Sequence, residues 1–252
     1  MDAYVYGVIR AGATEHSPGE GIEGKPVELV KSGELAALVS DAPKVPVKAN
    51  RRNLMAHSRV LQATIADTCV LPMRFGVVMP GREAVAQQLL DTHRERLAEH
   101  LRVLDPYVEL DVRALCPEHE LLQAVVAERP DIARLRTTME GRDVENTYHE
   151  SIRLGELVAQ AVAEKRDEMA RRILARLEPL AAAAQPGDPL HEQMVATVAF
   201  LVDRGRVQEF DAAVDEVGRQ LRDPEVRLRY LGPLPPHNFV DLASETEGWA
   251  WA

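Results

Sequence analysis

Apolar and polar residues in the first part of the chain follow the spacing of strands and of one amphipathic helix. Tyr4–Ile9 carries apolar side chains at even and odd positions, which predicts a strand covered on both faces. Val27–Val30 and Leu35–Ser40 predict two further strands, and Gly33 between them indicates a hairpin turn. A helix is expected from about Asn50, a suitable N-cap, to about residue 67, with Leu54, Leu61 and Ile65 on its buried face.

An apolar stretch containing a proline comes next. Val70–Val78 predicts a strand, and Pro72 within it indicates an edge position or a bulge. Gly81 introduces a helix that is expected to run to Leu104. The order strand, hairpin, helix, strand, helix predicts a small α/β sandwich with its helices on one face, over residues 1–105.

The rest of the chain, residues 106–242, predicts a second α/β domain. Strands are expected at Tyr107–Leu115, Met194–Val202 and Val226–Leu231, and helices from Pro117, from Pro130 and after Gly205. Residues 181–189 are interpreted as a connector. This order is close to a split βαβ unit, so the predicted fold class is α+β: two ferredoxin-like α/β domains with a long helical arm.

The predicted arm is a helix over residues 143–184, with a proline-free core at Asp143–Glu178 that contains a single glycine, Gly155. Its apolar residues share one stripe: Val158, Val162, Met169, Ile173, Leu177 and Leu180. The opposite face is charged, with Lys165 among its residues. A helix of roughly 50 Å is longer than a small domain. It therefore either joins two compact units or presents a coiled-coil face to a partner.

Composition narrows the classes of function. The net charge of −10 and the absence of a basic block argue against a nucleic-acid surface. Cys69 and Cys116 are far apart and are interpreted as buried thiols. The N-terminus lacks the pattern of a signal peptide, and no stretch is long and apolar enough to span a membrane, so we expect a cytoplasmic protein.

No motif in the chain predicts a catalytic residue, a cofactor or a metal. The eight histidines lack ligand spacing, and the hydrolase, phosphate-loop and dinucleotide motifs are missing. One cluster leaves two interpretations open. His57, with Arg51, Arg52 and Arg74, forms either an anion pocket or a helix start with a solvated basic face.

Two loops depart from the local pattern. Val70–Gly76 (Val-Leu-Pro-Met-Arg-Phe-Gly) places Pro, Arg and Gly in an apolar strand. Gly232–Val240 (Gly-Pro-Leu-Pro-Pro-His-Asn-Phe-Val) follows the last strand and should be stiff and extended. Its Leu234 and Phe239 either cover a domain or face a partner.

These loops, together with Tyr-Val-Tyr-Gly-Val-Ile at Tyr4–Ile9 and Leu-Ala-Ala-Leu-Val-Ser at Leu35–Ser40, resemble the gas vesicle protein L/F (GvpL/GvpF) family. The four marks are ordered and span nearly the whole chain. One departs from the family pattern, because His237 and Asn238 stand where the family usually has Tyr-Ser. Residues 243–252, with Trp249 and Trp251, lie outside the pattern and are expected to form a flexible tail or an accessory contact.

The resemblance implies a non-enzymatic accessory or minor structural protein of gas vesicle formation and buoyancy, located in the cytoplasm at the gas vesicle. It implies binding to the major gas vesicle shell protein and to other accessory proteins during nucleation and assembly, with two ferredoxin-like units and no cofactor. Neither a nucleic acid nor a membrane is expected as a partner.

An apolar shell protein needs its exposed face covered before assembly, and edge-strand pairing or a helix-lined groove could do this. The residues that we expect to bind a partner are Val158, Val162, Met169, Ile173, Leu71, Arg74, Phe75, Leu234 and Phe239. Two alternatives remain open: a ferredoxin-like ligand-sensing or scaffold module, and an enzyme built around the basic cluster at His57.

Overall fold

The chain forms two compact units in a computed structural model, which describes residues 1–13, 19–44, 46–139, 148–189, 191, 193–221 and 226–240. Unit 1 comprises residues 1–110, residues 201–204 and the segment from Gly232 on. Unit 2 comprises residues 111–200 and 205–231. The chain is a mixture of helix and sheet, as the predicted α+β class requires. The predicted tail 243–252 lies outside the described residues.

Unit 1 contains an antiparallel sheet with its first strand at the centre. Its strands are β1 (Ala3–Arg10), β2 (Glu28–Ser32), β3 (Leu35–Asp41), β4 (Leu71–Pro72) and β5 (Val78–Met79). The order is β2-β3-β1-β4, and β5 also pairs with β1. Every residue of β1 except its last, Arg10, is buried, which confirms the prediction of a strand covered on both faces. Gly33 lies in the β2–β3 turn with φ of +56°, the left-handed conformation that glycine adopts most easily.

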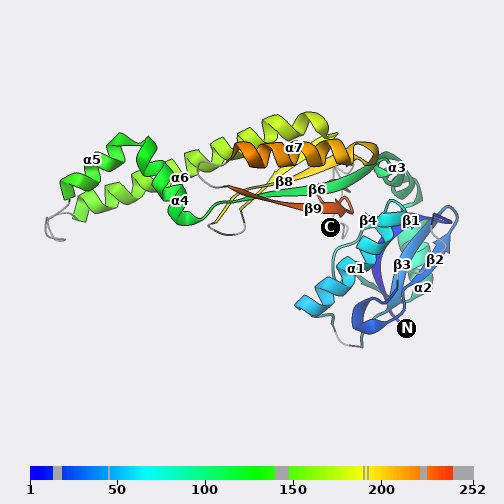
Figure 1. Ribbon diagram of the computed structural model, residues 1–252. Coiled ribbons are helices and arrows are strands. Elements are labelled where there is room, and N and C mark those ends of the chain that lie inside the picture. Colours follow the sequence, from blue (N-terminus) through cyan, green and yellow to red (C-terminus); the bar gives the residue numbers. More distant parts are fainter. Residues whose placement is uncertain are drawn as a thin grey trace. The chain divides into compact units, whose positions relative to one another are not determined.

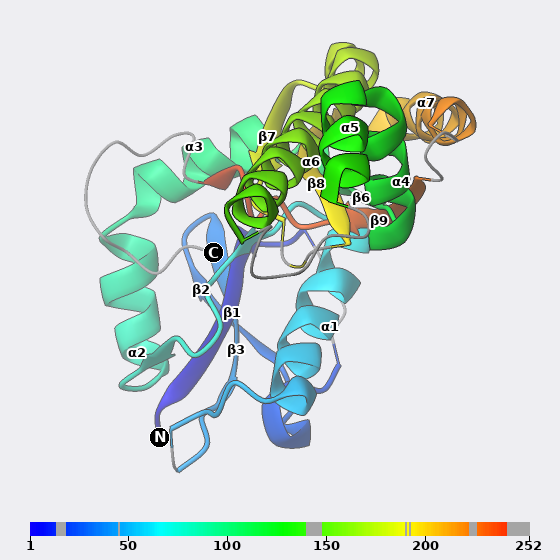
Figure 2. The same cartoon turned by 90° about the vertical axis from the view of Figure 1, so that its left-hand side faces the viewer.

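Helices cover both sides of this sheet. They are η1 (Ile22–Gly24), α1 (Arg51–Asp67), α2 (Arg82–Ala84), η2 (Val85–Asp91) and α3 (Arg94–Leu104). Helix α1 packs on β1, while η2 packs on β2 and β3, and Figure 2 shows α1 and the α2–α3 segment on opposite sides of the sheet. The prediction of helices on one face is therefore wrong. The reason lies in β1, because a strand that is apolar on both sides needs cover on both sides.

Four local predictions in unit 1 are confirmed or corrected by the structure. The Asn50 side chain accepts a hydrogen bond from the backbone N–H of Asn53 and so caps α1, as expected. Leu54 is 42% exposed and is not part of the buried face. The expected strand 70–78 is two short strands, β4 and β5, separated by a turn at Gly76. Pro72 lies in β4 at the edge of the sheet, where its missing N–H is tolerated.

The second sheet has the order β7-β8-β6-β9. Its strands are β6 (Tyr107–Leu115), β7 (Ala183–Gly187), β8 (Met194–Asp203) and β9 (Arg227–Leu234). The helices of this part are α4 (Glu118–Glu128), α5 (Pro130–Met139), α6 (Tyr148–Leu177), η4 (Glu178–Leu180), η5 (Arg204–Arg206) and α7 (Val207–Gln220). In unit 2, α6 and α7 lie side by side along one face of the sheet (Figure 1). The rings of Phe200 on β8 and Phe210 on α7 meet with centroids 5.1 Å apart.

The long helix α6 belongs wholly to unit 2, so of the two interpretations left open, an arm that joins two compact units does not fit the structure. It ends at Leu177 rather than at 184, and the expected connector contains strand β7 instead. Its predicted start at residue 143 lies outside the described residues. Figure 1 shows α4 and α5 beside the first half of α6, beyond the strands of the sheet. These two helices pack on the apolar side of the part of α6 that extends beyond the sheet.

Among the helices of the described residues, none combines the length and the apolar character needed to cross a membrane.

Candidate functional site

The turn between β4 and β5, Met73–Gly76, is fixed by buried polar groups of unit 1. The backbone N–H of Gly76 donates to the Tyr4 hydroxyl at 3.0 Å, and His57 Nε2 lies 3.1 Å from the carbonyl oxygen of Met73. Gly76 has φ of +93°, which lets the chain reverse here. The turn therefore presents an exposed Arg74 and a half-buried Phe75 on a rigid backbone.

Hydrogen bonding determines the tautomer of His57. A carbonyl oxygen only accepts, so Nε2 carries the proton and donates to Met73. Nδ1 then accepts from the Tyr4 hydroxyl at 3.0 Å. Burial lowers the pKa of His57 to about 4, because a charged imidazole loses its hydration there. Burial likewise raises the pKa of Tyr4. Both groups are therefore neutral near pH 7 and act as a fixed support for the turn.

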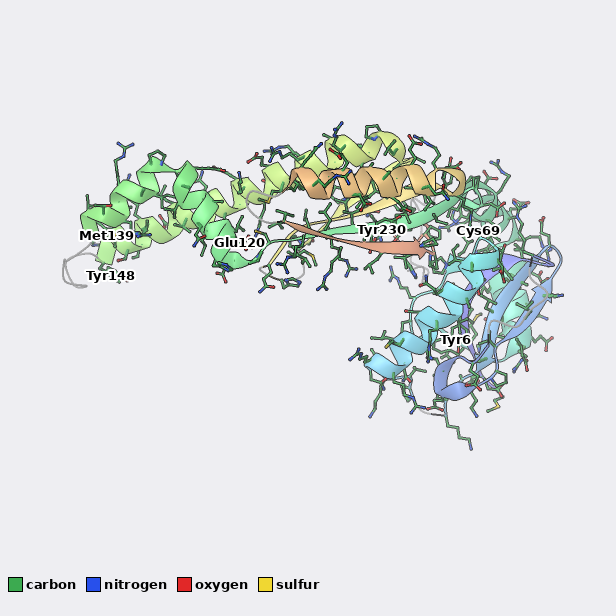
Figure 3. All side chains as sticks on the ribbon, viewed as in Figure 1. Tyr6, Cys69, Glu120, Met139, Tyr148 and Tyr230 are labelled. Carbon is green, nitrogen blue, oxygen red and sulfur yellow. The ribbon has the colours of Figure 1, made fainter. Side chains whose placement is uncertain are left out.

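Tyr6 extends this support toward the start of the chain. Its hydroxyl shares a 2.9 Å hydrogen bond with Ser40 and accepts from the backbone N–H of Ile22 at 2.7 Å. Its ring stacks on His57 with centroids 5.5 Å apart, and Phe75 makes an edge-to-face contact with His57 with centroids 5.8 Å apart. Tyr6 is labelled in Figure 3 inside unit 1. The cluster is aromatic, buried and hydrogen-bonded, as a structural core is.

The anion pocket left open by the sequence is not formed. His57 is only 6% exposed and neutral, while Arg51 and Arg52 are exposed at the start of α1. An anion pocket would need the arginines and the histidine to point at one place. Both ring nitrogens of His57 are instead hydrogen-bonded to Tyr4 and Met73. The interpretation of a helix start with a solvated basic face fits the structure.

The closing segment Gly232–Val240 packs on unit 1. The backbone N–H and the side-chain amide of Asn238 donate to the two carboxylate oxygens of the buried Glu109, at 2.8 and 2.7 Å. Gln62 on α1 donates to the carbonyl oxygen of Pro233 at 3.0 Å. Phe239 is 2% exposed, so it covers the domain rather than facing a partner. Asn238, where the sequence departs from the family motif, therefore has a bidentate structural role here.

Half of the eight apolar residues expected to bind a partner lie inside the fold, and the other half are partly buried. Leu71, Met169 and Ile173 are at most 2% exposed, so they are unavailable as contact residues while the protein is folded. Leu234 is half-buried. Val158 and Val162 are also half-buried and pack against a small core of Val125, Ile132 and Ala161 contributed by α4, α5 and α6. Of the nine residues, Arg74 alone is exposed.

The sequence also misplaced one charge and missed two exposed apolar residues. Lys165, assigned to the solvated face of the long helix, is 8% exposed and bonds to Glu128 at 2.7 Å and to Glu168 at 3.2 Å. Tyr148 and Ile152 at the start of α6 are 62% and 46% exposed. The apolar stripe predicted for the long helix begins at Val158 and therefore does not include them.

Histidine, cysteine and acidic side chains do not gather in groups of three or more suited to a metal ion anywhere in the described part of the chain. Cys69 and Cys116 are buried thiols that form no disulfide, as predicted. Burial raises the pKa of the Cys69 thiol to about 12, so the thiol is not poised for reaction.

Comparisons with known proteins identify the family. The family model "Gas vesicle synthesis protein GvpL/GvpF" matches residues 2–241. Gas vesicle protein F of Streptomyces sp. (strain CB03234) is 38% identical over 244 residues, covering 96% of this chain and 100% of that protein. Gas vesicle protein L of the same strain is 28% identical over 264 residues, covering 96% and 94%.

Solved structures agree. The crystal structure of the gas vesicle protein GvpF from Anabaena sp. PCC7120 matches with a TM-score of 0.79 and 26% identity, covering 95% of this chain and 98% of that one. That of GvpF from Microcystis aeruginosa matches with a TM-score of 0.77 and 25% identity, with the same coverage. The chain has a role in gas vesicle formation and belongs to the gas vesicle synthesis protein GvpL/GvpF family.

Proposed function

We propose that this protein is a non-enzymatic assembly protein of the gas vesicle, which binds the major shell protein and other accessory proteins in the cytoplasm during nucleation and growth. The observation that carries the proposal is the match to the GvpL/GvpF family over residues 2–241. The curated relatives are likewise named as gas vesicle proteins F and L.

The turn Met73–Gly76, which carries Arg74 and Phe75, is our proposed contact with the shell protein. Arginine and aromatic side chains dominate the energetics of protein interfaces, because each combines apolar area with directional hydrogen bonding. A contact residue on a rigid backbone loses little entropy on binding. Here the backbone of the turn is fixed by Tyr4 and His57, so Arg74 needs only its own side chain to be ordered.

The test is a co-expression pull-down of the protein with the major shell protein in a host without gas vesicles. Arg74→Glu should reduce capture at least tenfold, since it replaces the positive guanidinium of the turn by a negative carboxylate. Arg52→Glu is the matched control, because Arg52 is an exposed arginine of the same unit, in the first turn of α1 rather than in Met73–Gly76. Capture should be unchanged in this control.

Both variants should melt like the wild type, since both arginines are exposed. Equal capture by all three proteins would exclude the turn as the contact. In a further outcome, the wild-type protein fails to capture the shell protein and still captures other accessory proteins. That result would show that it contacts the accessory proteins and not the shell protein directly.

We also propose that both units are variants of the ferredoxin-like fold. The two sheets share one strand order, β2-β3-β1-β4 and β7-β8-β6-β9, in which the first strand in the chain pairs with the third and the fourth. In unit 1 all pairs are antiparallel. This strand order is the one that a split βαβ unit produces.

A further inference from the structure

The first half of α6 carries a stripe of exposed, uncharged residues that is bordered on one side by Glu156. The exposed residues of this face recur at steps of three and four: Tyr148, Ile152, Gly155, Ala159 and Ala163. They lie on one side of the helix, while Val158 and Val162 turn toward the core formed with α4 and α5. Two large exposed apolar side chains thus adjoin three small positions.

Tyr148 and Ile152 are the feature that calls for a partner. They are 62% and 46% exposed, and they are two of the eight large apolar residues that the described part of the chain leaves exposed. Figure 3 shows Tyr148 at the end of α6 that projects beyond the sheet of unit 2. A polar surface would serve solubility better here, so an apolar face kept open to solvent indicates a contact surface.

The order of large and small residues along the face is self-complementary. If two copies of α6 lie antiparallel with a two-fold axis between Gly155 and Glu156, Tyr148 of one copy meets Ala163 of the other. Ile152 then meets Ala159, so every large side chain faces a small one. An ideal Cβ at Gly155 has no atom within 4 Å, which leaves the region of the axis open for the close approach of another helix.

From this arrangement we infer that α6 is the interface of a homodimer, in which the exposed Tyr148–Ala163 faces of two copies pack antiparallel. Such an interface is isologous, the commonest kind in homo-oligomers. Its contact length of about 24 Å involves one helix per copy. This buries less than the roughly 1,200 Å² of a stable complex, so the dimer forms at high concentration and dissociates on dilution.

Charge at the rim sets the salt dependence of this dimer. Glu156 is exposed beside the two-fold axis, so the two copies of its carboxylate approach each other. Salt screens that repulsion and strengthens apolar contact, so dimerisation should tighten as ionic strength rises. An interface formed by opposite charges would weaken instead. The inference does not depend on the proposed contact with the shell protein, which uses the turn in unit 1.

Sedimentation velocity of the full chain over a hundredfold range of concentration tests the inference. The wild type should shift from monomer to dimer. Ile152→Ala removes the large partner and Ala159→Ile places two isoleucines in opposition, so each should weaken the dimer at least tenfold. The double variant I152A/A159I exchanges large and small positions and should dimerise again. A structural effect of either single change would not be rescued in this way.

A cysteine cross-link reports the register independently of affinity. Gly155→Cys places a thiol beside the proposed axis, and mild oxidation should produce a disulfide-linked dimer. Arg153→Cys, on the opposite side of the helix, is the control and should cross-link poorly. The native Cys69 and Cys116 are buried and should remain unlinked. A monomer at every concentration, a dimer indifferent to the Ile152 and Ala159 changes, or equal cross-linking at 153 and 155 would each overturn the inference.

Discussion

Strand β1 of unit 1 and the helical end of unit 2 are two opposite ways of building a stable region. The helical end is defined here as α4, α5 and the first half of α6. In β1 the residues from Ala3 to Ile9 are all buried and pair with strands on both sides. At the helical end a core of Val125, Ile132 and Ala161 is supplemented by ion pairs. The first region is stabilised by packing, and the second depends more on helix propensity and charge.

This difference indicates which surfaces of the protein are rigid and which tolerate movement and substitution. A turn that rests on β1 and α1 is rigid, because moving it breaks hydrogen bonds inside a close-packed core. Three helices around a small core open at lower free energy and tolerate substitution on their exposed faces. The proposed contact at Arg74 and the proposed dimer face on α6 therefore belong to regions with different mechanical properties.

The largest expected effect is the loss of stability of unit 1 in acid. The folded protein keeps His57 neutral down to about pH 4, whereas the unfolded chain binds a proton near pH 6.5. Stability is therefore full above pH 6.5, falls as the pH decreases to 4, and levels off below. The free energy lost is about 3 kcal/mol for this group. Urea unfolding at pH 7.5 and 4.5 measures it.

His57→Leu is the comparison for that measurement. It removes the titrating group, so its pH slope between 6.5 and 4 should be shallower than that of the wild type, although its stability at pH 7.5 is lower. An identical slope in both proteins would show that other groups cause the acid sensitivity.

Second in size is a glycine substitution in β1. A Cβ added at Gly7 would lie 2.8 Å from the carbonyl oxygen of Leu71 and 2.8 Å from Cγ2 of Val70. Backbone and core atoms must then move, so Gly7→Ala should cost about 2 kcal/mol of the free energy of unfolding. Chemical denaturation followed by circular dichroism measures this cost. A neutral outcome would show that the edge of the sheet at β4 is far more adaptable than its burial suggests.

Third is an ion pair at the helical end. Glu128→Gln removes one of the two carboxylates that bond to the buried Lys165, and should cost about 1 kcal/mol. Glu164→Gln is its control, because Glu164 is as exposed as Glu128 but its cation, Arg129, is more exposed than Lys165 and keeps its second partner Asp131. That change should cost less than Glu128→Gln does. Equal costs would show that burial of Lys165 adds nothing to the pair.

The smallest expected effect is a gain in stability. It comes from the same type of substitution, glycine to alanine, that is expected to destabilise β1 at Gly7. Gly155→Ala adds a Cβ that meets no atom within 4 Å on an exposed helix. It should raise the stability of unit 2 by about 0.5–1 kcal/mol, because alanine favours the helix. Thermal unfolding at a concentration where the protein is monomeric measures the gain. Destabilisation by Gly155→Ala would contradict the open surface on which the proposed dimer rests.

Local patterns predicted nearly all the elements of this protein. The two-faced apolar strand at Tyr4–Ile9, the hairpin around Gly33 and the cap at Asn50 were predicted because each depends on neighbours in the sequence. The family resemblance was also available, since its marks are short stretches with special backbone needs. One of them, Met73–Gly76, proved to be the braced turn.

Predictions about faces and partners of elements were less successful. Lys165 was assigned to solvent and Met169 and Ile173 to a partner, yet all three are buried. A helical period states which residues share a side, but it does not state what packs on that side. The strand β7 was missed because Ala183–Gly187 has little strand character of its own and is paired by β8.

The sequence by itself determined the class of fold, the boundaries of most elements and the family to which the chain belongs. Only the tertiary structure decided that helices cover both sides of the first sheet, that His57 is a neutral brace, and that α6 is exposed at Tyr148 and Ile152. The physical reason is range. Propensity and periodicity act over a few residues, whereas burial, tautomer and exposure are set by contacts between segments far apart in the chain.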